Sequence, residues 1–293
     1  MANPAPATTA PRIRHPVALV ILLSAAFLSL RFLSAVVSPA LPRATAVLWV
    51  SSMLTLITYL AMIISLAALI ASVRCRAVTM LILLVVFSAA CVFTRWILTV
   101  YFKNPVIMNE LDDLLNGLGD LLLVLAALLF GRLVAPLVSD RNLLVPVALV
   151  SSIVDFWGVY WGFVHFASKK AAKVVAHFSA VVPQAGPPVL GGPRLGSIGL
   201  GDFVFMAIFF AVVAKFRMAW RTTLWLSLLC LLIAAYAFIG LSALPGLPFL
   251  AAAVLLANWH HFSLSRTEKV LVIWSVVIIS ALLAIVTLIS KIM

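Results

Sequence analysis

The sequence predicts an all-α fold, a polytopic bundle of about nine membrane-spanning helices. Hydrophobic residues make up 65% of the 293-residue chain and charged residues only 10%, and the mean hydropathy is +1.25. This composition excludes a soluble globular domain and is typical of an integral membrane protein. Apolar runs of about 18 residues recur along the chain, and such continuous runs indicate helices because membrane strands would alternate polar and apolar residues.

The expected helices follow one another along most of the chain. They cover residues 16–37, 45–72, 78–101, 117–138, 143–166, 198–214, 220–241, 244–259 and 270–290. A basic, Pro/Ala-rich tail at 1–15 precedes them, and the first run is too long for a signal peptide and is interrupted by Arg31, so we expect an uncleaved helix. We divide the helices into an N-terminal group, 16–138, and a C-terminal group, 139–293, with a loop at 167–197.

Charge and cysteine usage point to the lipid bilayer as a partner. The net charge of +12 is spread over many short loops, which indicates topology signals and headgroup contacts and no nucleic-acid partner. The cysteines Cys75, Cys91 and Cys230 have no CxxC spacing and are interpreted as packing residues. His260 and His261 point about 100° apart on a helix and have no third ligand nearby, so we expect no metal site and no cofactor.

Three acids fall within the apolar runs: Asp120, Asp155 and Asp202. An acid inside a membrane helix is costly and therefore indicates a functional site. Asp120 and Asp202 each end a Gly-Leu-Gly-Asp motif, at 117–120 and 199–202. Because no Asp or Glu precedes Glu110, we interpret Asp120 as an acid near a helix N-terminus that is stabilised by the helix dipole. Asp155 and Asp202 are therefore the better candidates for two acids that lie close enough to share a proton.

A proline-rich segment opens the apolar run after the second motif. Residues 245–248 read Pro-Gly-Leu-Pro and are called here the PGLP segment. Together with Asp155 and the motif at 199–202, this segment resembles the presenilin and signal peptide peptidase group of intramembrane aspartyl proteases. The resemblance covers about residues 143–260. It implies a presenilin-like fold and catalytic roles for Asp155 and Asp202.

The chain also departs from the pattern of that group. Val154 stands where the group usually has Tyr, Gly246 replaces Ala in the Pro-Ala-Leu element, and a further apolar run follows the proline-rich helix. These departures indicate a divergent prokaryotic-type member, and we expect a multi-pass protein of a prokaryotic cytoplasmic membrane. Its expected partners are proteins with transmembrane-helix segments, and its oligomeric state stays open.

The resemblance implies an aspartic endopeptidase that hydrolyses transmembrane helices or signal-peptide remnants. Gly199 and Gly201 would leave room for a peptide backbone, although glycines also permit helix packing. Residues 194–198 are suited to pair with an unwound substrate strand. The prolines of the PGLP segment cannot donate backbone hydrogen bonds, which leaves carbonyls near the helix start that could hold the substrate. The expected substrate-binding residues are Gly199, Leu200, Gly201, Pro245, Gly246 and Leu247.

Other functions are compatible with the same residues. A proton- or cation-coupled transporter also uses intramembrane acids and glycine-interrupted helices, and the repeated Gly-Leu-Gly-Asp motif is a hint of related halves. A catalytically silent protein that binds membrane helices would keep the groove without needing both acids. A structural alternative pairs Asp155 and Asp202 separately with Arg95 or Arg132, which lie near the ends of their runs.

Overall fold

A computed structural model describes residues 16–37, 45–73, 75–101, 109–161, 178–183, 197–237 and 245–292. The tail at 1–15 and most of the 167–197 loop, including Arg194, lie outside these residues. The described helices are α1 (Pro16–Val37), α2 (Thr45–Ser72), α3 (Ala77–Tyr101), α4 (Asn109–Val134), α5 (Leu144–Tyr160), α8 (Leu200–Lys215), α9 (Trp220–Ala237), α10 (Leu247–Ala257) and α11 (Arg266–Ile292). Short 3-10 turns follow α4, precede α5 and follow α10, at Ala135–Leu137, Arg141–Leu143 and Trp259–His261.

The described residues are mostly helical, as predicted, whereas the number of about nine membrane-spanning helices stays a prediction. Six of the described helices contain a segment long and apolar enough to cross a membrane, and two shorter apolar helices, Trp220–Tyr236 and Leu247–Ala257, accompany them. The crossing segments lie at Pro16–Ser34, Val47–Ser72, Ala77–Leu98, Leu114–Leu137, Arg141–Tyr160 and Arg266–Leu288. The fold is therefore compatible with a membrane helix bundle.

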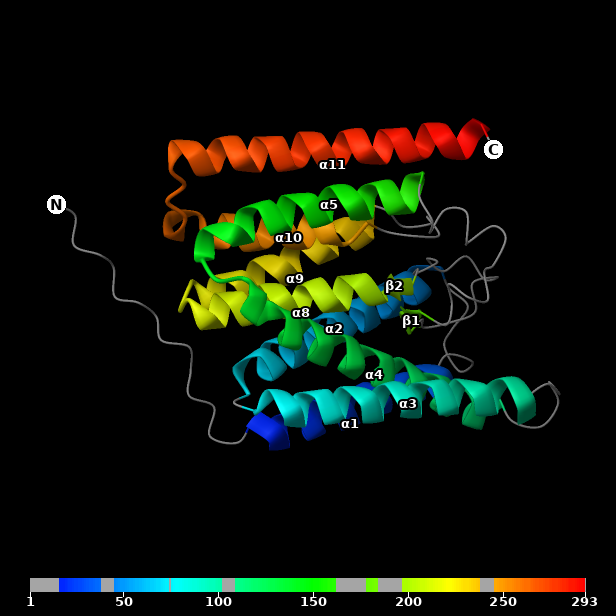
Figure 1. The fold of residues 1–293 in the computed structure, drawn as a ribbon. Coiled ribbons are helices and arrows are strands. Elements are labelled where there is room, and N and C mark those ends of the chain that lie inside the picture. The colour runs from blue at the N-terminus through cyan, green and yellow to red at the C-terminus, as the bar shows by residue number, and fades with distance from the viewer. Residues whose placement is uncertain are drawn as a thin grey trace.

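The helices lie roughly side by side in an elongated bundle (Figure 1). α11 forms one edge and packs mainly against α5, and α10 lies between α5 and α9. α8 occupies the middle, where it contacts α2 and α4, and α1 and α3 pack at the opposite edge, both against α4. The helix that carries Asp202 is thus the central one.

The sequence of α8 explains its central place. Buried residues run without interruption from Met206 to Val213, so this part of the helix is covered on all sides. A helix that is apolar all round is expected in the core of a bundle. Gly131 of α4 lies against the backbone carbonyl of Val204, where a Cβ atom would clash. The missing side chain lets α4 and α8 approach closely, as small residues do between membrane helices.

The outer helices present apolar side chains to their surroundings. On α11, Ile273, Trp274, Ile285 and Leu288 are all more than half exposed. Exposed apolar surface on this scale is unfavourable in water and is compatible with contact to lipid. The exposed apolar side chains of α11 therefore agree with the membrane location that the composition indicates.

A small antiparallel sheet closes the end of the bundle at which α8 begins (Figure 1). Strand β1 (Ser179–Val181) pairs with β2 (Ser197–Gly199), with Ala180 opposite Ile198. The N–H of Leu200 donates to the carbonyl of Phe178 at 3.0 Å, which continues the ladder into the first residue of α8. β2 therefore joins the sheet directly to the helix that carries Asp202.

Several predicted helix ends are corrected. α4 begins at Asn109 and not at 117, because a polar first turn extends the helix beyond its apolar run. Asp120 consequently lies inside α4, and its interpretation as an acid near a helix N-terminus is wrong. α10 begins at Leu247, with Pro248 in its first turn, where a missing N–H costs no helical hydrogen bond.

Candidate active site

Asp155 is placed by helix α5 and meets the start of helix α10. Its Oδ2 atom accepts a hydrogen bond from the backbone N–H of Leu247 at 3.1 Å. Leu247 is the first residue of α10, so this N–H has no partner within its own helix. The Asp155 carboxylate therefore lies at the N-terminal end of α10, where the free amides favour a negative charge.

Asp202 lies in the first turn of α8, directly after strand β2. The backbone N–H of Gly199 interacts favourably with its carboxylate. The Oδ1 atom of Asp202 is shielded from solvent and has no hydrogen-bond partner among the described residues. A buried acid oxygen without a partner is unusual in a folded protein and often indicates a functional site.

The two carboxyl groups come together at the PGLP segment. Asp155 and Asp202 interact electrostatically with each other. An ideal Cβ atom placed on Gly246 would lie 3.1 Å from Oδ1 of Asp202, while the next residue, Leu247, donates to Asp155. Gly246 thus lies against one acid as Leu247 binds the other, and a side chain at position 246 would press on Asp202.

A cavity of about 610 Å³ opens beside this pair, between α5 and α8. Asp155, Gly201 and Leu247 contribute to its wall, and most of the remaining wall is apolar. An ideal Cβ atom on Gly201 would meet no atom within 4 Å. This glycine therefore does not serve helix packing, in contrast to Gly131, and it leaves open space next to Asp202.

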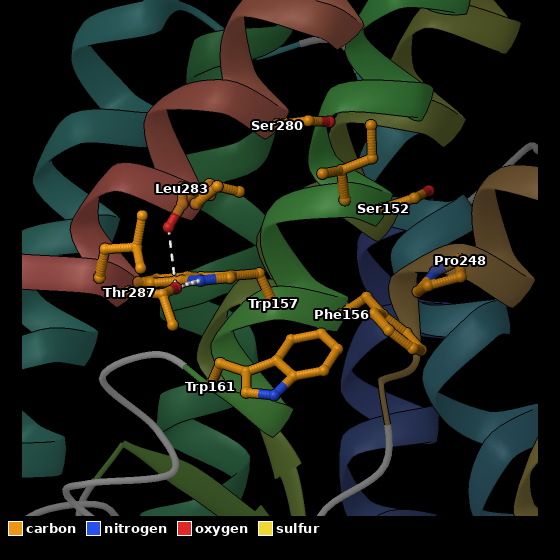
Figure 2. Close-up of a pocket in the computed structure, with 11 residues that line it drawn as sticks. Ser152, Phe156, Trp157, Trp161, Pro248, Ser280, Leu283 and Thr287 are labelled. Carbon is orange, nitrogen blue, oxygen red and sulfur yellow. Dashed lines mark hydrogen bonds between the residues drawn. The ribbon is translucent and has the colours of Figure 1, made fainter. Parts of the chain in front are cut away.

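A second pocket, of about 590 Å³, lies on another face of α5, between α5, α10 and α11. Figure 2 shows the indole of Trp157 pointing toward α11, where its Nε1 donates to Oγ1 of Thr287 at 2.7 Å. Phe156, Trp161 and Pro248 also contribute to this wall, and none of the lining residues is an acid. Trp157 borders both cavities.

Asp120 lies apart from this pair. It forms ion pairs with Arg31 of α1 and Arg95 of α3, and the Arg95 Nη2 to Asp120 Oδ1 distance is 3.0 Å. The alternative in which Arg95 neutralises Asp155 or Asp202 is therefore wrong. A signal for these pairs was present in the sequence, because charges inside apolar helices need partners and Arg31 interrupts the first apolar run.

The predicted substrate-binding residues gather around the two acids. Gly199 and Leu200 join β2 to α8, and Gly201 borders the cavity. Pro245, Gly246 and Leu247 are buried, with Gly246 against Asp202 and Leu247 bonded to Asp155. Sequence reasoning missed the cavity residues Val150 and Phe205 and the strand β1. Within the described ranges, His, Cys, Asp and Glu form no cluster of three or more that would suit a metal ion.

Comparison of the chain with models of known families, with curated proteins and with solved structures finds no match.

Proposed function

We propose that the protein is an intramembrane aspartyl protease that hydrolyses peptide bonds of membrane-spanning helices, with Asp155 and Asp202 as its catalytic pair. The observation that carries this proposal is the meeting of the two acids at the PGLP segment, where Leu247 donates to Asp155 and Gly246 lies against Asp202. The segments involved are far apart in the sequence, and the resemblance to presenilin-type proteases implies this same grouping.

The chemistry follows from two carboxyl groups in a poorly hydrated site. Two like charges held close together are not both ionised, so one acid keeps its proton and the pair titrates as a unit. The ionised acid accepts a proton from water as that water attacks the scissile carbonyl carbon. The protonated acid gives its proton to the carbonyl oxygen, which forms a gem-diol and exchanges the protonation states of the two acids, as in soluble aspartic proteases. The acid that took the proton from water then passes it to the amide nitrogen as the C–N bond breaks. The other acid takes a proton from the gem-diol, which leaves a carboxylic acid and an amine as products and restores the starting state of the pair.

The substrate backbone needs a partner for its own polar groups. A membrane helix bonds its amides internally, so it must unwind before attack, and the unwound backbone then needs new hydrogen bonds. In an antiparallel ladder the hydrogen-bonded residue pairs alternate, and the bond from Leu200 to Phe178 places the N–H and C=O groups of Ser197 and Gly199 away from β1. The Gly199 N–H interacts with Asp202, which leaves both backbone groups of Ser197 and the C=O of Gly199 for a substrate strand. The outer edge of β2 thus offers a place for an added strand.

Gly201 provides the test of this arrangement. We expect the purified protein in liposomes to cleave a synthetic transmembrane peptide, and Gly201→Ala to lower kcat/KM about tenfold because the added methyl group enters the cavity beside Asp202. Thermal stability should not change, since an ideal Cβ there meets no atom within 4 Å. Peptide cleavage and thermal unfolding are measured on the same preparations. An unchanged kcat/KM would remove Gly201 from the substrate path, and a wild-type protein that cleaves no peptide would contradict the proposal itself.

A further inference from the structure

The N-terminal helices contain a buried group of charges that the proposed chemistry does not use. Asp120 of α4 is 5% exposed and pairs with Arg31 of α1 and with Arg95 of α3. Glycines make this possible, because Gly117 lies beside the stem of Arg31 and Gly119 beside the stem of Arg95. The first Gly-Leu-Gly-Asp motif therefore admits two arginine side chains to the surface of α4.

Arg31, Arg95 and Asp120 are called here the charge cluster. Two of them, Asp120 and Arg95, contact strand β1. Oδ2 of Asp120 accepts a hydrogen bond from the N–H of Val181 at 3.1 Å, and Nη2 of Arg95 donates to the carbonyl of Ser179 at 3.2 Å. These backbone groups lie on the edge of β1 that faces away from β2, as the ladder requires. The side chains thus act in place of a third strand and hold β1 against α4.

We infer that Asp120 is a positioning residue: together with Arg31 and Arg95 it fixes β1, and through β1 it fixes β2 and the entry to α8. The order of contacts supports this, because β1 pairs with β2, and β2 leads without interruption into the turn that carries Asp202. This inference rests on the proposed function for its catalytic consequence. The substrate strand would dock on the other edge of β2, so a loose β1 weakens substrate binding before it affects chemistry.

Two variants separate this role from a general effect on folding. Asp120→Asn removes the charge that both arginines contact, and loss of one partner of a buried ion pair is strongly destabilising, so this variant alone is insufficient. Val181→Pro removes the N–H that donates to Asp120 and places the ring Cδ against Oδ2 of that residue, so it breaks this one contact without disturbing the β1–β2 hydrogen bonds. It leaves all three charges in place. Val181→Ala keeps the N–H and is the matched control for Val181→Pro. Asp140→Asn is the control for loss of an acid, because Asp140 is exposed and only caps a 3-10 turn.

The first measurement is steady-state cleavage of a transmembrane peptide. We expect Asp120→Asn and Val181→Pro to raise KM about tenfold, as loss of one hydrogen bond of this strength allows, with kcat within about threefold of the wild type. Both controls should behave as the wild type does. An unchanged KM, with a kcat that falls in parallel with thermal stability, would show a merely structural role and overturn the inference. Equal KM values for Val181→Pro and Val181→Ala would overturn it as well.

The second measurement is independent of catalysis. Hydrogen exchange of the Ala180 and Ile198 amides, which face each other in the sheet, should become about tenfold faster in Val181→Pro and in folded Asp120→Asn, while the α9 amides keep the wild-type rate. Unchanged exchange in both variants overturns the positioning role whether or not the protein is a protease. Faster exchange in a protein whose wild type cleaves nothing supports the role of Asp120 in holding the strand and contradicts the proposed function alone.

Discussion

Asp155→Asn and Asp202→Asn should each lower kcat for a transmembrane peptide by about 10²- to 10⁴-fold, the range that proton transfer by a positioned group contributes. Asparagine keeps the shape of the side chain but cannot exchange the proton. In Asp155→Asn the amide oxygen can still accept from the Leu247 N–H, so the contact between α5 and α10 is retained. The loss should therefore appear in kcat without a matching loss of stability. Single-turnover cleavage at saturating peptide and thermal unfolding measure the two quantities.

Asp140→Asn is the matched control for these two variants, because this acid is exposed in the connection between α4 and α5. It should cleave at the wild-type rate. The double variant should be no slower than either single one, because residues that act as a unit show strongly non-additive losses. Full activity in either single variant would rule out the catalytic pair, and a further large loss in the double variant would indicate that the two acids act independently.

Adding side chains at Gly246 should lower turnover in order of size. A Cβ atom there would lie 3.1 Å from Oδ1 of Asp202 and 3.4 Å from its Cγ, so Gly246→Ala requires the carboxyl group to shift by a few tenths of an ångström. Gly246→Val crowds the acid further. A displacement of about 1 Å in a catalytic group can cost about 10²-fold, and we expect a loss of that size for Val and a smaller one for Ala. The measurement is kcat at saturating peptide.

Gly158→Ala is the control for this series. Gly158 borders the same cavity, but a Cβ atom there would meet nothing within 4 Å and therefore would not touch Asp202, unlike one on Gly246. We expect kcat at saturating peptide to be unchanged, whereas KM rises because the methyl group takes up space in the cavity, as in Gly201→Ala. Thermal stability of each variant shows whether the fold survives. Equal kcat for Gly246→Val and the wild type would mean that the PGLP segment does not set the position of Asp202 and serves only as the start of α10.

The helices and their order follow from the sequence because a continuous apolar run has few other structures open to it in a membrane. The first three described helices begin within one residue of the predicted positions. The start of α4 was missed since its first turns are polar and the apolar criterion does not detect them. The pairing of Asp155 with Asp202 was accessible because two acids in neighbouring apolar runs have few other partners.

The sequence did not predict the sheet or the place of Asp120. β1 has only three residues, too few for an alternating pattern, and its edge is completed by side chains from distant helices. The two Gly-Leu-Gly-Asp motifs are alike in residues but differ in context. At 117–120 the glycines make room for arginines, whereas at 199–202 the motif joins a strand to a helix beside an open cavity. Only tertiary contacts separate the two roles.

The central claim, that Asp155 and Asp202 together hydrolyse a peptide bond, separates from the transporter alternative in one experiment on sealed liposomes. The purified protein and a transmembrane peptide are reconstituted together, the peptide products are identified by mass spectrometry, and proton flux is followed in the same vesicles. We predict two fragments whose masses sum to that of the peptide plus one water, formed by the wild type and not by Asp202→Asn, without proton flux that depends on Asp202. An intact peptide together with a proton flux that Asp202→Asn abolishes would contradict the account and assign the two acids to a transport pathway.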